Sequence, residues 1–587
     1  MEARALYGTE APPALQQRLV AGPVSLGLEG GNLRHLRHGE TELIRAVAFL
    51  VRDRDWGTLA PEIRDLRIEV GDETRVSYTA HFDSGVARLA VDVTIRLTAG
   101  LLRFAAEARA TGDFETNRTG FTVLHPIEGV AGAPLRVEHG DALAEDSQFP
   151  VLIAPWQPFQ NITGLIHQAG GLRVTCRFEG DVFEMEDQRQ WGDASYKTYV
   201  RPLALPWPYC IADGSVIRQA VEIRWEAVAP AAPVAPLRCV VPDAVFPETA
   251  LLLDAAEAAR PDAPALIRQI GPQRLLCHLD AAAGHGLTEL RAFADLQARL
   301  PECAFDLELI AHCRPDGDLT AEFTGHAADL ARAGFHPASV MVCPAVDRQS
   351  TPPGSEWPAC TPLEAIHRAA RAAFAGIALG GGMASFFPEL NRKRPPVALL
   401  DFVSHGLCPI VHAADDLSVM ETLETVPHIM LSAQAIAAGA ARRLGPSTLA
   451  MRQNPYGSRT LPNPGRGRVC MTDDDPRQDG AFAAAWTLGL ATQIAPAGLQ
   501  VWTPAGLTGP RGLFHTDGRA RPLAAVVARL AGLAGQPVNA AELGGGRSRL
   551  ACGARVLEAN LTATAQGPLP PYGWREDLQA GRQGTMP

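Results

Sequence analysis

Acidic side chains stand in or directly after short apolar runs of this sequence, where a folded sheet would bury them or present them at its edge. Glu308 lies in such a run, FDLELIAHC at 305–313, and shares its parity with Asp306 and His312. A carboxylate buried beside a histidine titrates abnormally and can act as a general acid or base. A buried salt bridge would use the same residues, so both interpretations stay open.

Glu389 belongs to a second candidate segment, GGGMASFFPELNRKRP at 380–395. Glycines let a ligand approach the backbone, phenylalanines offer a stacking surface, and a carboxylate can move protons. Asn391 and Arg392 follow as possible substrate ligands. The alternative is a surface loop held by a Glu–Arg pair.

Histidines at the ends of predicted strands supply further chemistry. His405 and His412 end consecutive runs and could donate a proton, whereas ordinary hydrogen-bonded histidines are the simpler interpretation. The sequence has no HxH, HExxH or Cys/His spacing, and the acidic run at 472–476 is typical of a solvated loop. We therefore expect no metal site and no cofactor. Other polar or aromatic strand-end residues that could bind substrate are Asp280, Arg452, Asn454 and Trp502.

The segment FEMEDQRQWGDASYKTYVRPLALPWP at 183–208 is unusually rich in polar and aromatic side chains. Lys197 is one of two lysines in a chain that otherwise uses arginine, which indicates a requirement for an amine at this position. The segment could face the mouth of the barrel and contribute to the binding site of a polyhydroxylated ligand, or it could form a buried network that joins the two domains. Its substrate-binding candidates are Glu186, Asp187, Tyr196 and Lys197.

The periodicity of the sequence predicts three regions. Residues 1–235 alternate with period two and predict an N-terminal β-sandwich, followed by a Pro/Ala-rich linker at 229–238. Residues 239–535 alternate strand and helix and predict a (β/α)8 barrel, because no Gly-rich dinucleotide loop supports an open doubly wound sheet. Residues 536–587 predict a short C-terminal β segment that could join N-terminal strands. The eight expected barrel strands are 274–280, 305–313, 339–345, 376–382, 397–406, 408–413, 448–454 and 499–503.

Composition narrows the class of protein. The 587 residues are 47% hydrophobic with a formal charge of −11, which suits large cores and argues against a nucleic-acid partner. No apolar run is long enough to span a membrane, and the N-terminus lacks the basic residues followed by an apolar run that mark a secretory signal. The eleven cysteines are an odd number without a CxxC pair, which indicates free thiols in the cytoplasm. The sequence does not predict an oligomeric state.

A sandwich followed by a barrel is common in glycoside hydrolases, whose retaining members need two carboxylates roughly 5 Å apart. In the large barrel clan of these enzymes the pair stands after strands 4 and 7. By the strand count above, strand 4 leads to Glu389, whereas strand 7 (TLAMRQN) leads to no acid. Glu308 or Asp401 could substitute, so glycoside hydrolysis stays as the alternative and not the first choice.

Several segments resemble the D-apionate lactonase family of bacterial apiose catabolism. The most specific is EDQRQWGDASYKTY, with RTGFTVLHPIEG, GGGMASFFPELNRKRP, DFVSHGLCPIVHAADDLSVMETLE and RQNPYG beside it. The resemblance implies hydrolysis of a 1,4-lactone, D-apionolactone, to D-apionate, with a small-molecule sugar lactone as substrate. We expect general acid/base activation of water, since no GxSxG nucleophile is present. Glu389 or Glu308 would be the base and His405 or His412 the proton donor. A catalytically idle sugar-binding protein is the third hypothesis.

Overall fold

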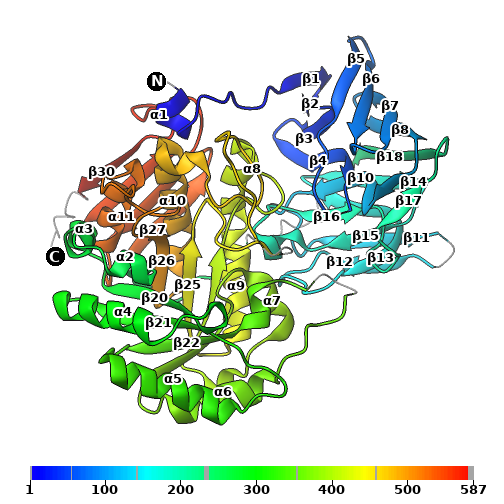
Figure 1. Cartoon of the computed structure of the whole chain (residues 1–587). Helices are drawn as coiled ribbons and strands as arrows, with labels where there is room; N and C mark the ends of the chain where they lie inside the picture. Colours follow the sequence, from blue (N-terminus) through cyan, green and yellow to red (C-terminus); the bar gives the residue numbers. More distant parts are fainter. Residues whose placement is uncertain are drawn as a thin grey trace. The chain divides into compact units, whose positions relative to one another are not determined.

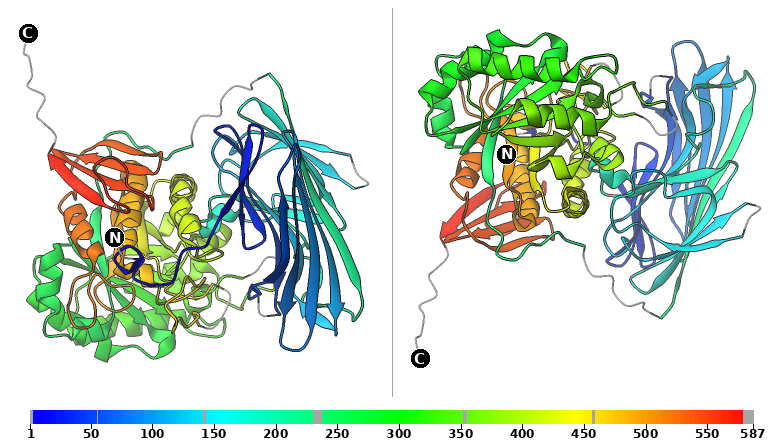
Figure 2. Two further views of the ribbon diagram at one scale, coloured as in Figure 1. Left: turned by 90° about the horizontal axis from the view of Figure 1, so that it is seen from above. Right: turned by 90° about the horizontal axis from the view of Figure 1, so that it is seen from below.

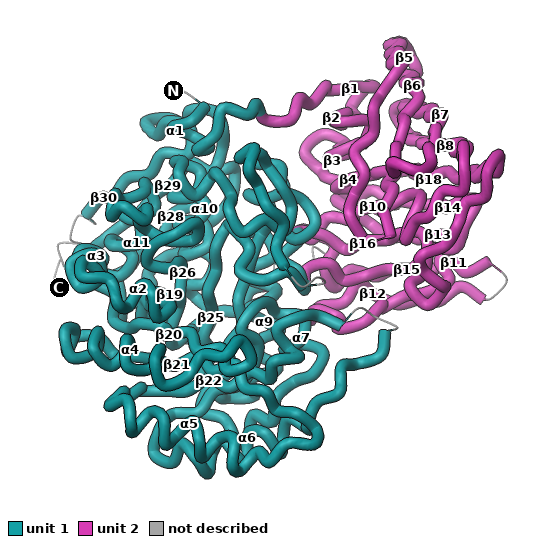
Figure 3. The backbone as a smooth tube through the Cα atoms, viewed as in Figure 1, with its two compact units in different colours: residues 1–12, 190–193, 238–587 teal, residues 13–189, 194–237 magenta. Residues whose placement is uncertain are grey.

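The computed structural model describes residues 3–54, 56–140, 143–229, 237–351, 355–455 and 459–578. The chain divides into two compact units (Figure 3). The β-unit holds residues 13–189 and 194–237, and the barrel unit holds residues 1–12, 190–193 and 238–587. The predicted linker at 229–238 lies mostly outside the described residues. Residues 190–193, which belong to the polar and aromatic segment at 183–208, thus lie in the barrel unit.

The β-unit is built on one 16-stranded antiparallel sheet. Its long strands alternate buried and exposed residues, as in Arg88–Leu97, so one face carries the apolar side chains. A separate two-stranded sheet pairs β17 with β9. The strands are β1 Gln17–Ala21, β2 Val24–Glu29, β3 Asn32–His38, β4 Thr41–Arg52, β5 Glu62–Glu69, β6 Thr74–Asp83, β7 Arg88–Leu97, β8 Leu101–Thr111, β9 Phe114–Thr116, β10 Arg118–His125, β11 Pro134–His139, β12 Glu145–Gln148, β13 Phe159–Ala169, β14 Leu172–Glu179, β15 Phe183–Glu186, β16 Tyr196–Tyr199, β17 Tyr209–Ile211 and β18 Val216–Ala227.

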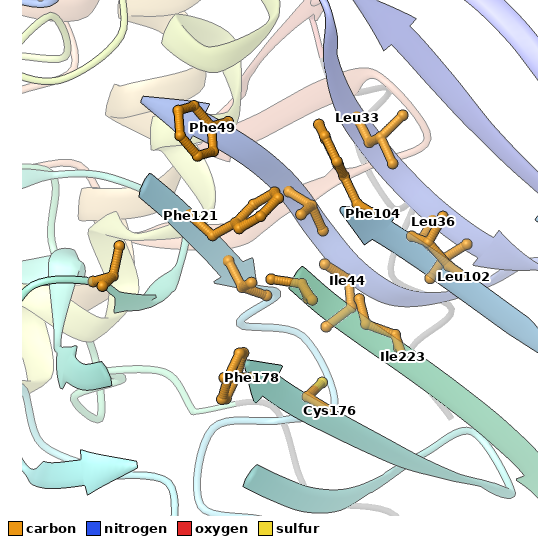
Figure 4. Packing of buried hydrophobic residues seen from close by; sticks show 14 of the residues in the cluster. Leu33, Leu36, Ile44, Phe49, Leu102, Phe104, Phe121, Cys176, Phe178 and Ile223 are labelled. Carbon is orange, nitrogen blue, oxygen red and sulfur yellow. The ribbon is translucent and has the colours of Figure 1, made fainter. Parts of the chain in front are cut away.

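The large sheet folds over on itself, so that its two halves enclose a shared core (Figure 2). Phe104 of β8 and Phe121 of β10 are far apart in the strand order, yet their ring centres lie 4.9 Å apart. Phe49 of β4 packs edge-on against Phe121 at 5.3 Å (Figure 4). The contact between Phe104 and Phe121 joins the inner faces of the two halves, which is the sandwich arrangement that the sequence predicts.

The barrel unit contains eight parallel strands that close on themselves, with helices on the outside (Figure 1). The predicted (β/α)8 barrel is therefore confirmed. Its strands are β19 Glu248–Leu253, β20 Arg274–Asp280, β21 Ala304–Ala311, β22 Ser339–Pro344, β23 Ala378–Gly382, β24 Phe402–Leu407, β25 Ala441–Ser447 and β26 Val501–Gly506. Its helices are α2 Ala255–Ala258, α3 Ala263–Ile270, α4 Leu287–Arg299, α5 Leu319–Ala333, α6 Leu363–Ala373, α7 Phe387–Lys393, α8 Asp416–Glu421, α9 Val426–Ala437, α10 Ala481–Ile494 and α11 Pro522–Ala531.

Two of the expected barrel strands are wrong. Residues 408–413 and 448–454 lie in loops, while β19 and β25 complete the barrel instead. β25 has the sequence ARRLGPS, and its Arg443 faces the lumen, where it bonds Ser339 at 2.7 Å. An inward-facing cation breaks the apolar pattern by which a buried strand is found. Counted from β19, Glu389 follows the fifth strand and not the fourth.

The C-terminal segment forms a four-stranded antiparallel sheet of its own, and the described N-terminal strands do not extend it. The expectation that those strands would join it is therefore wrong. Helix α10 is apolar on all sides and is buried from Phe482 to its end, as suits a helix between the barrel and this sheet. In the N-terminal part of the barrel unit lies the short helix α1, Ala3–Tyr7. The sheet strands are β27 Val538–Gly544, β28 Arg547–Cys552, β29 Arg555–Asn560 and β30 Trp574–Leu578.

Within the described ranges, every helix is too short or too polar to cross a membrane.

Candidate active site

Side chains of β20 and β21 alternate between the outer helices and the barrel lumen. Leu275, Cys277 and Leu279 point outward and are buried, so His278 and Asp280 point inward. On β21 the same alternation turns Glu308 into the lumen, where it lines a small internal cavity. The predicted inward position of Glu308 agrees with this, whereas His312 lies beyond the end of its strand.

Asp306 occupies the amino-terminal layer of the lumen, away from the end where barrel enzymes act. It accepts hydrogen bonds from Arg274 at 2.7 and 2.9 Å and from Ser339 at 2.5 Å. Arg443 lies 3.4 Å from the same carboxylate. Asp306, Arg274, Ser339 and Arg443 thus form a closed polar network at the amino-terminal end of the barrel strands.

Glu308 is the centre of a second network, nearer the carboxyl ends of the strands. His278 Nδ1 lies 2.7 Å from Glu308 Oε1, and Arg452 Nη1 donates to Oε2 at 3.0 Å. Arg452 Nη2 bonds Oε1 as well, and Nη1 also donates to the carbonyl of Ala384 at 2.9 Å. An ionised carboxylate only accepts, so Nδ1 of His278 must carry the proton.

The electrostatics of this network define the role of each member. Burial alone would raise the pKa of Glu308, but the Arg452 charge and the bonds from His278 and Arg452 lower it to about 2. Burial, and secondarily the Arg452 charge, lower the pKa of His278, although Glu308 opposes them. Glu308 is therefore a poor proton acceptor, whereas His278 is neutral with Nε2 as its basic atom.

Asp280 continues the inward face of β20 and is bound by Arg348, which follows β22. Its other oxygen accepts the amide of Ala283 at 3.0 Å and so caps the turn after the strand. Asp280 thus joins the ends of β20 and β22 close to His278.

Glu389 stands in the first turn of α7 and is 2% exposed. Its Oε2 accepts the Ser350 hydroxyl at 2.6 Å, while Oε1 accepts the Thr351 amide at 2.9 Å and Arg392 at 3.4 Å. Burial raises its pKa, and Arg392 and these bonds oppose the rise. Both oxygens are engaged, so the carboxylate fastens the loop after β22 to α7.

Helix α7 carries the other polar residues of the predicted loop. Asn391 is buried, and Lys393 pairs with Asp347, a carboxylate after the fourth strand. Arg394 donates to the Asn391 carbonyl at 3.1 Å.

His405 is buried within β24, two residues before the strand ends, and so does not end its strand as expected. Its Nδ1 bonds the Gly406 carbonyl at 2.9 Å, and its ring packs on Phe387 at 5.2 Å. Burial lowers its pKa to about 4. This histidine is neutral near pH 7, which weakens it as a proton donor.

His412 lies in the loop after β24 and pairs with a residue from far earlier in the chain. Its Nδ1 is 2.6 Å from Asp193 Oδ2, and Trp191 packs edge-on against its ring at 5.9 Å. The guanidinium of Arg392 lies 5.7 Å from the Trp191 ring centre. Residues 190–193 therefore connect His412 with α7.

The remaining barrel candidates lie apart from these contacts. Asn454 donates to the Arg459 carbonyl, and Trp502 points outward between Ser447 and Phe246. Asp401 precedes β24, at the amino-terminal end, where it pairs with Arg371. In the acidic run, Asp475 caps a 3-10 turn and binds Arg477. No group of three or more metal-ligating side chains occurs among the described residues.

The four substrate-binding candidates from the 183–208 segment lie in the β-unit: Glu186, Asp187, Tyr196 and Lys197. Lys197 and Glu186 form an ion pair of 2.6 Å, and burial lowers the pKa of Lys197 while Glu186 opposes that shift. Asp187 binds Arg189 at 2.7 Å with both side chains fully buried, and Tyr196 donates to the Pro150 carbonyl at 2.6 Å. Within the β-unit these residues form an internal polar network.

The sequence places His278 at the end of an expected strand but assigns it no catalytic role, and it does not single out Arg348 or Asp193 as site residues. His278 and Arg348 could have been found from strand ends, because each lies at or after the carboxyl end of a correctly predicted strand. Asp193 pairs across 219 residues of sequence, which no local pattern reveals.

Comparison with known proteins gives matches over most of the chain. The family models "D-apionate lactonase, N-terminal domain" and "D-apionate lactonase, TIM barrel domain" match residues 4–228 and 249–535. A D-apionate lactonase of Brucella anthropi is 46% identical over 549 residues, 90% of each chain.

Two of the solved structures that match this chain are remote in sequence. A GH36 alpha-galactosidase of Geobacillus stearothermophilus is 11% identical with a TM-score of 0.27, covering 93% of this chain and 91% of its own. A galactose mutarotase-like protein of Clostridium acetobutylicum is 8% identical with a TM-score of 0.25, covering 37% and 98%. The two family models, together with the relative from Brucella anthropi, show that this chain belongs to the D-apionate lactonase family.

Proposed function

We propose that this chain hydrolyses a sugar 1,4-lactone, D-apionolactone, to the open acid D-apionate. The likeness to the D-apionate lactonase of Brucella anthropi carries the proposal. The cytoplasm is the proposed compartment, supported by eleven cysteines that are all free thiols.

The chemistry requires a base for the attacking water, positive charge near the developing oxyanion and a proton for the leaving alkoxide. His278 is the base: Glu308 holds its Nδ1–H at 2.7 Å and leaves Nε2 to accept the proton of water. In this arrangement Glu308 is a positioning residue, as the carboxylate is in a Ser-His-Asp triad. Arg452 adds positive charge beside the same imidazole.

Glycoside hydrolysis is not favoured. The fourth strand leads to Asp347, which is neutralised by Lys393, and the seventh leads to Arg452, with no acid between Thr448 and Pro455. A retaining glycosidase needs a carboxylate at each of these two strand ends, and residues 448–455 after the seventh strand offer none.

Acid release from a panel of aldonolactones, run beside nitrophenyl glycosides, tests the proposal. The expected result is acid from the branched 1,4-lactone and no nitrophenol. Nitrophenol without acid would support the glycosidase, and binding without either product would support the idle sugar-binding protein.

A further inference from the structure

Asp193 is anchored within the barrel unit by several independent contacts. Its backbone carbonyl accepts the Thr425 hydroxyl at 2.8 Å, just before α9. Gly192 has φ +92°, a conformation that suits glycine, and it lies beside Leu407 and Cys408 at the end of β24. These contacts fix the direction in which Asp193 presents its carboxylate.

That carboxylate meets His412 in a geometry suited to orienting an imidazole. The Nδ1 to Oδ2 distance is 2.6 Å, and both side chains are 16% exposed. Trp191 is 3% exposed and stands perpendicular to the imidazole, at 87°, which limits rotation of the ring. With Nδ1 bound to Asp193, Nε2 is the nitrogen left for chemistry.

The Asp193–His412 pair connects to the Glu308 network through one segment of the chain. Residues 383–386 link β23 to α7: Ala384 accepts a bond from Arg452, and α7 carries Arg392, which lies against Trp191. Both histidine–carboxylate pairs therefore attach to the chain that follows β23. His278 lies near the carboxyl end of β20, and His412 lies in the loop after the carboxyl end of β24.

We infer that Asp193 is the positioning residue for His412 and that His412 donates the proton to the leaving ring oxygen of the lactone. The inference rests on the proposed function and assigns the acid half of that reaction. It also gives residues 190–193, which come from the β-rich N-terminal region of the sequence, a role in barrel chemistry.

The step balances as follows. Water attacks the carbonyl carbon and gives a proton to His278 Nε2. When the tetrahedral intermediate collapses, the bond from carbon to ring oxygen breaks and its electron pair goes to that oxygen. The oxygen takes the proton of His412 Nε2, while His412 keeps its Nδ1 proton, which is hydrogen-bonded to Asp193. His278 then loses its proton to solvent, His412 regains one, and the acid product releases one proton net.

The experiment compares Asp193→Asn, His412→Gln and the double variant with the full-length wild type in acid release from D-apionolactone. Each single variant should lower kcat about 10²-fold with KM within about threefold, because proton transfer and not binding is affected. The double variant should be no slower than His412→Gln alone, since Asp193 acts through His412. Asp193→Glu, whose carboxylate can still reach Nδ1, should recover most of the lost kcat.

Asp329→Asn is the matched control, because it removes a carboxylate that pairs with Arg332 on the surface of α5. It should leave kcat unchanged. Full kcat in His412→Gln overturns the inference whether or not Asp193→Asn folds, and additive losses in the double variant overturn the link between the two residues. An inactive wild type would instead contradict the proposed function.

Discussion

Glu308 and His278 are adjacent inward-facing residues of neighbouring barrel strands, joined by a 2.7 Å hydrogen bond from Nδ1 to Oε1. Their strands are paired in register at these two residues. The relationship follows from parallel pairing and not from loop conformation, so the site has a rigid base. It also divides the work between a carboxylate that stays charged and an imidazole that exchanges a proton.

Replacing Glu308 with Gln should impair both catalysis and stability. His278 loses the charge that orients it, so kcat should fall at least about 10²-fold. Arg452 is left without its carboxylate in the lumen, which should destabilise the barrel by about 3–5 kcal/mol. Calorimetry and the lactone assay measure the two effects separately.

The double variant Glu308→Gln with Arg452→Gln separates these effects further. Removing both charges should restore part of the lost stability, since no buried cation is left unpaired, while activity stays low. If activity returned together with stability, the role of Glu308 would be structural.

Activity should be lost on the acid side of neutrality. His278 must be neutral to accept a proton, and its pKa is lowered by burial and by the Arg452 charge. The enzyme should therefore be active at pH values above this lowered pKa, and kcat/KM should decline as the pH falls through it. In a profile of kcat/KM, the acid limb should lie below the ordinary histidine value of about 6.5. A limb at or above that value would argue against His278 as the base.

Two buried histidines of the β-unit should make its stability sensitive to acid. Burial lowers the pKa of His125 to about 3 and that of His167 to about 4. The unfolded chain binds their protons below about pH 6.5 and the folded chain does not, so stability is complete above 6.5 and falls as pH drops toward 4.

The His167→Phe variant checks this effect. The slope of its free energy of unfolding against pH should be smaller than that of wild type by about 1.4 kcal/mol per pH unit. The exposed His336→Gln variant serves as its control and should leave the slope as in wild type. Equal slopes in all three proteins would contradict the assignment.

Gly406 should tolerate no side chain. A Cβ there would lie 1.8 Å from the Ser385 carbonyl oxygen, so Gly406→Ala must displace either β24 or the segment before α7. We expect a loss of about 1–3 kcal/mol in stability, together with lower kcat. Gly465→Ala, where a Cβ meets nothing within 4 Å, should behave as wild type in both measurements.

The sequence predicts the sandwich and the barrel because their strands and helices keep a regular apolar period. It fails where tertiary contacts override that period. β25 hides Arg443 in the lumen, and residues 408–413 are apolar yet pack as a loop. β19, ETALLL, begins with two polar residues, so its apolar run is too short to predict a strand.

Only part of the candidate site can be predicted from the sequence. Glu308 could be placed in the lumen from its parity, but its partners could not: Arg452 is 144 residues away in sequence, and its charge reverses the pKa shift that burial alone would produce. Glu389 stands in a suggestive segment, yet its oxygens are used to hold Ser350 and Thr351.

The most direct test compares Glu308→Gln and Glu389→Gln in acid release from D-apionolactone at pH 7. The account predicts that Glu308→Gln loses at least about 10²-fold in kcat, whereas Glu389→Gln retains a kcat within about tenfold of wild type. The reverse order, with Glu389→Gln inactive and Glu308→Gln close to wild type, would contradict the account.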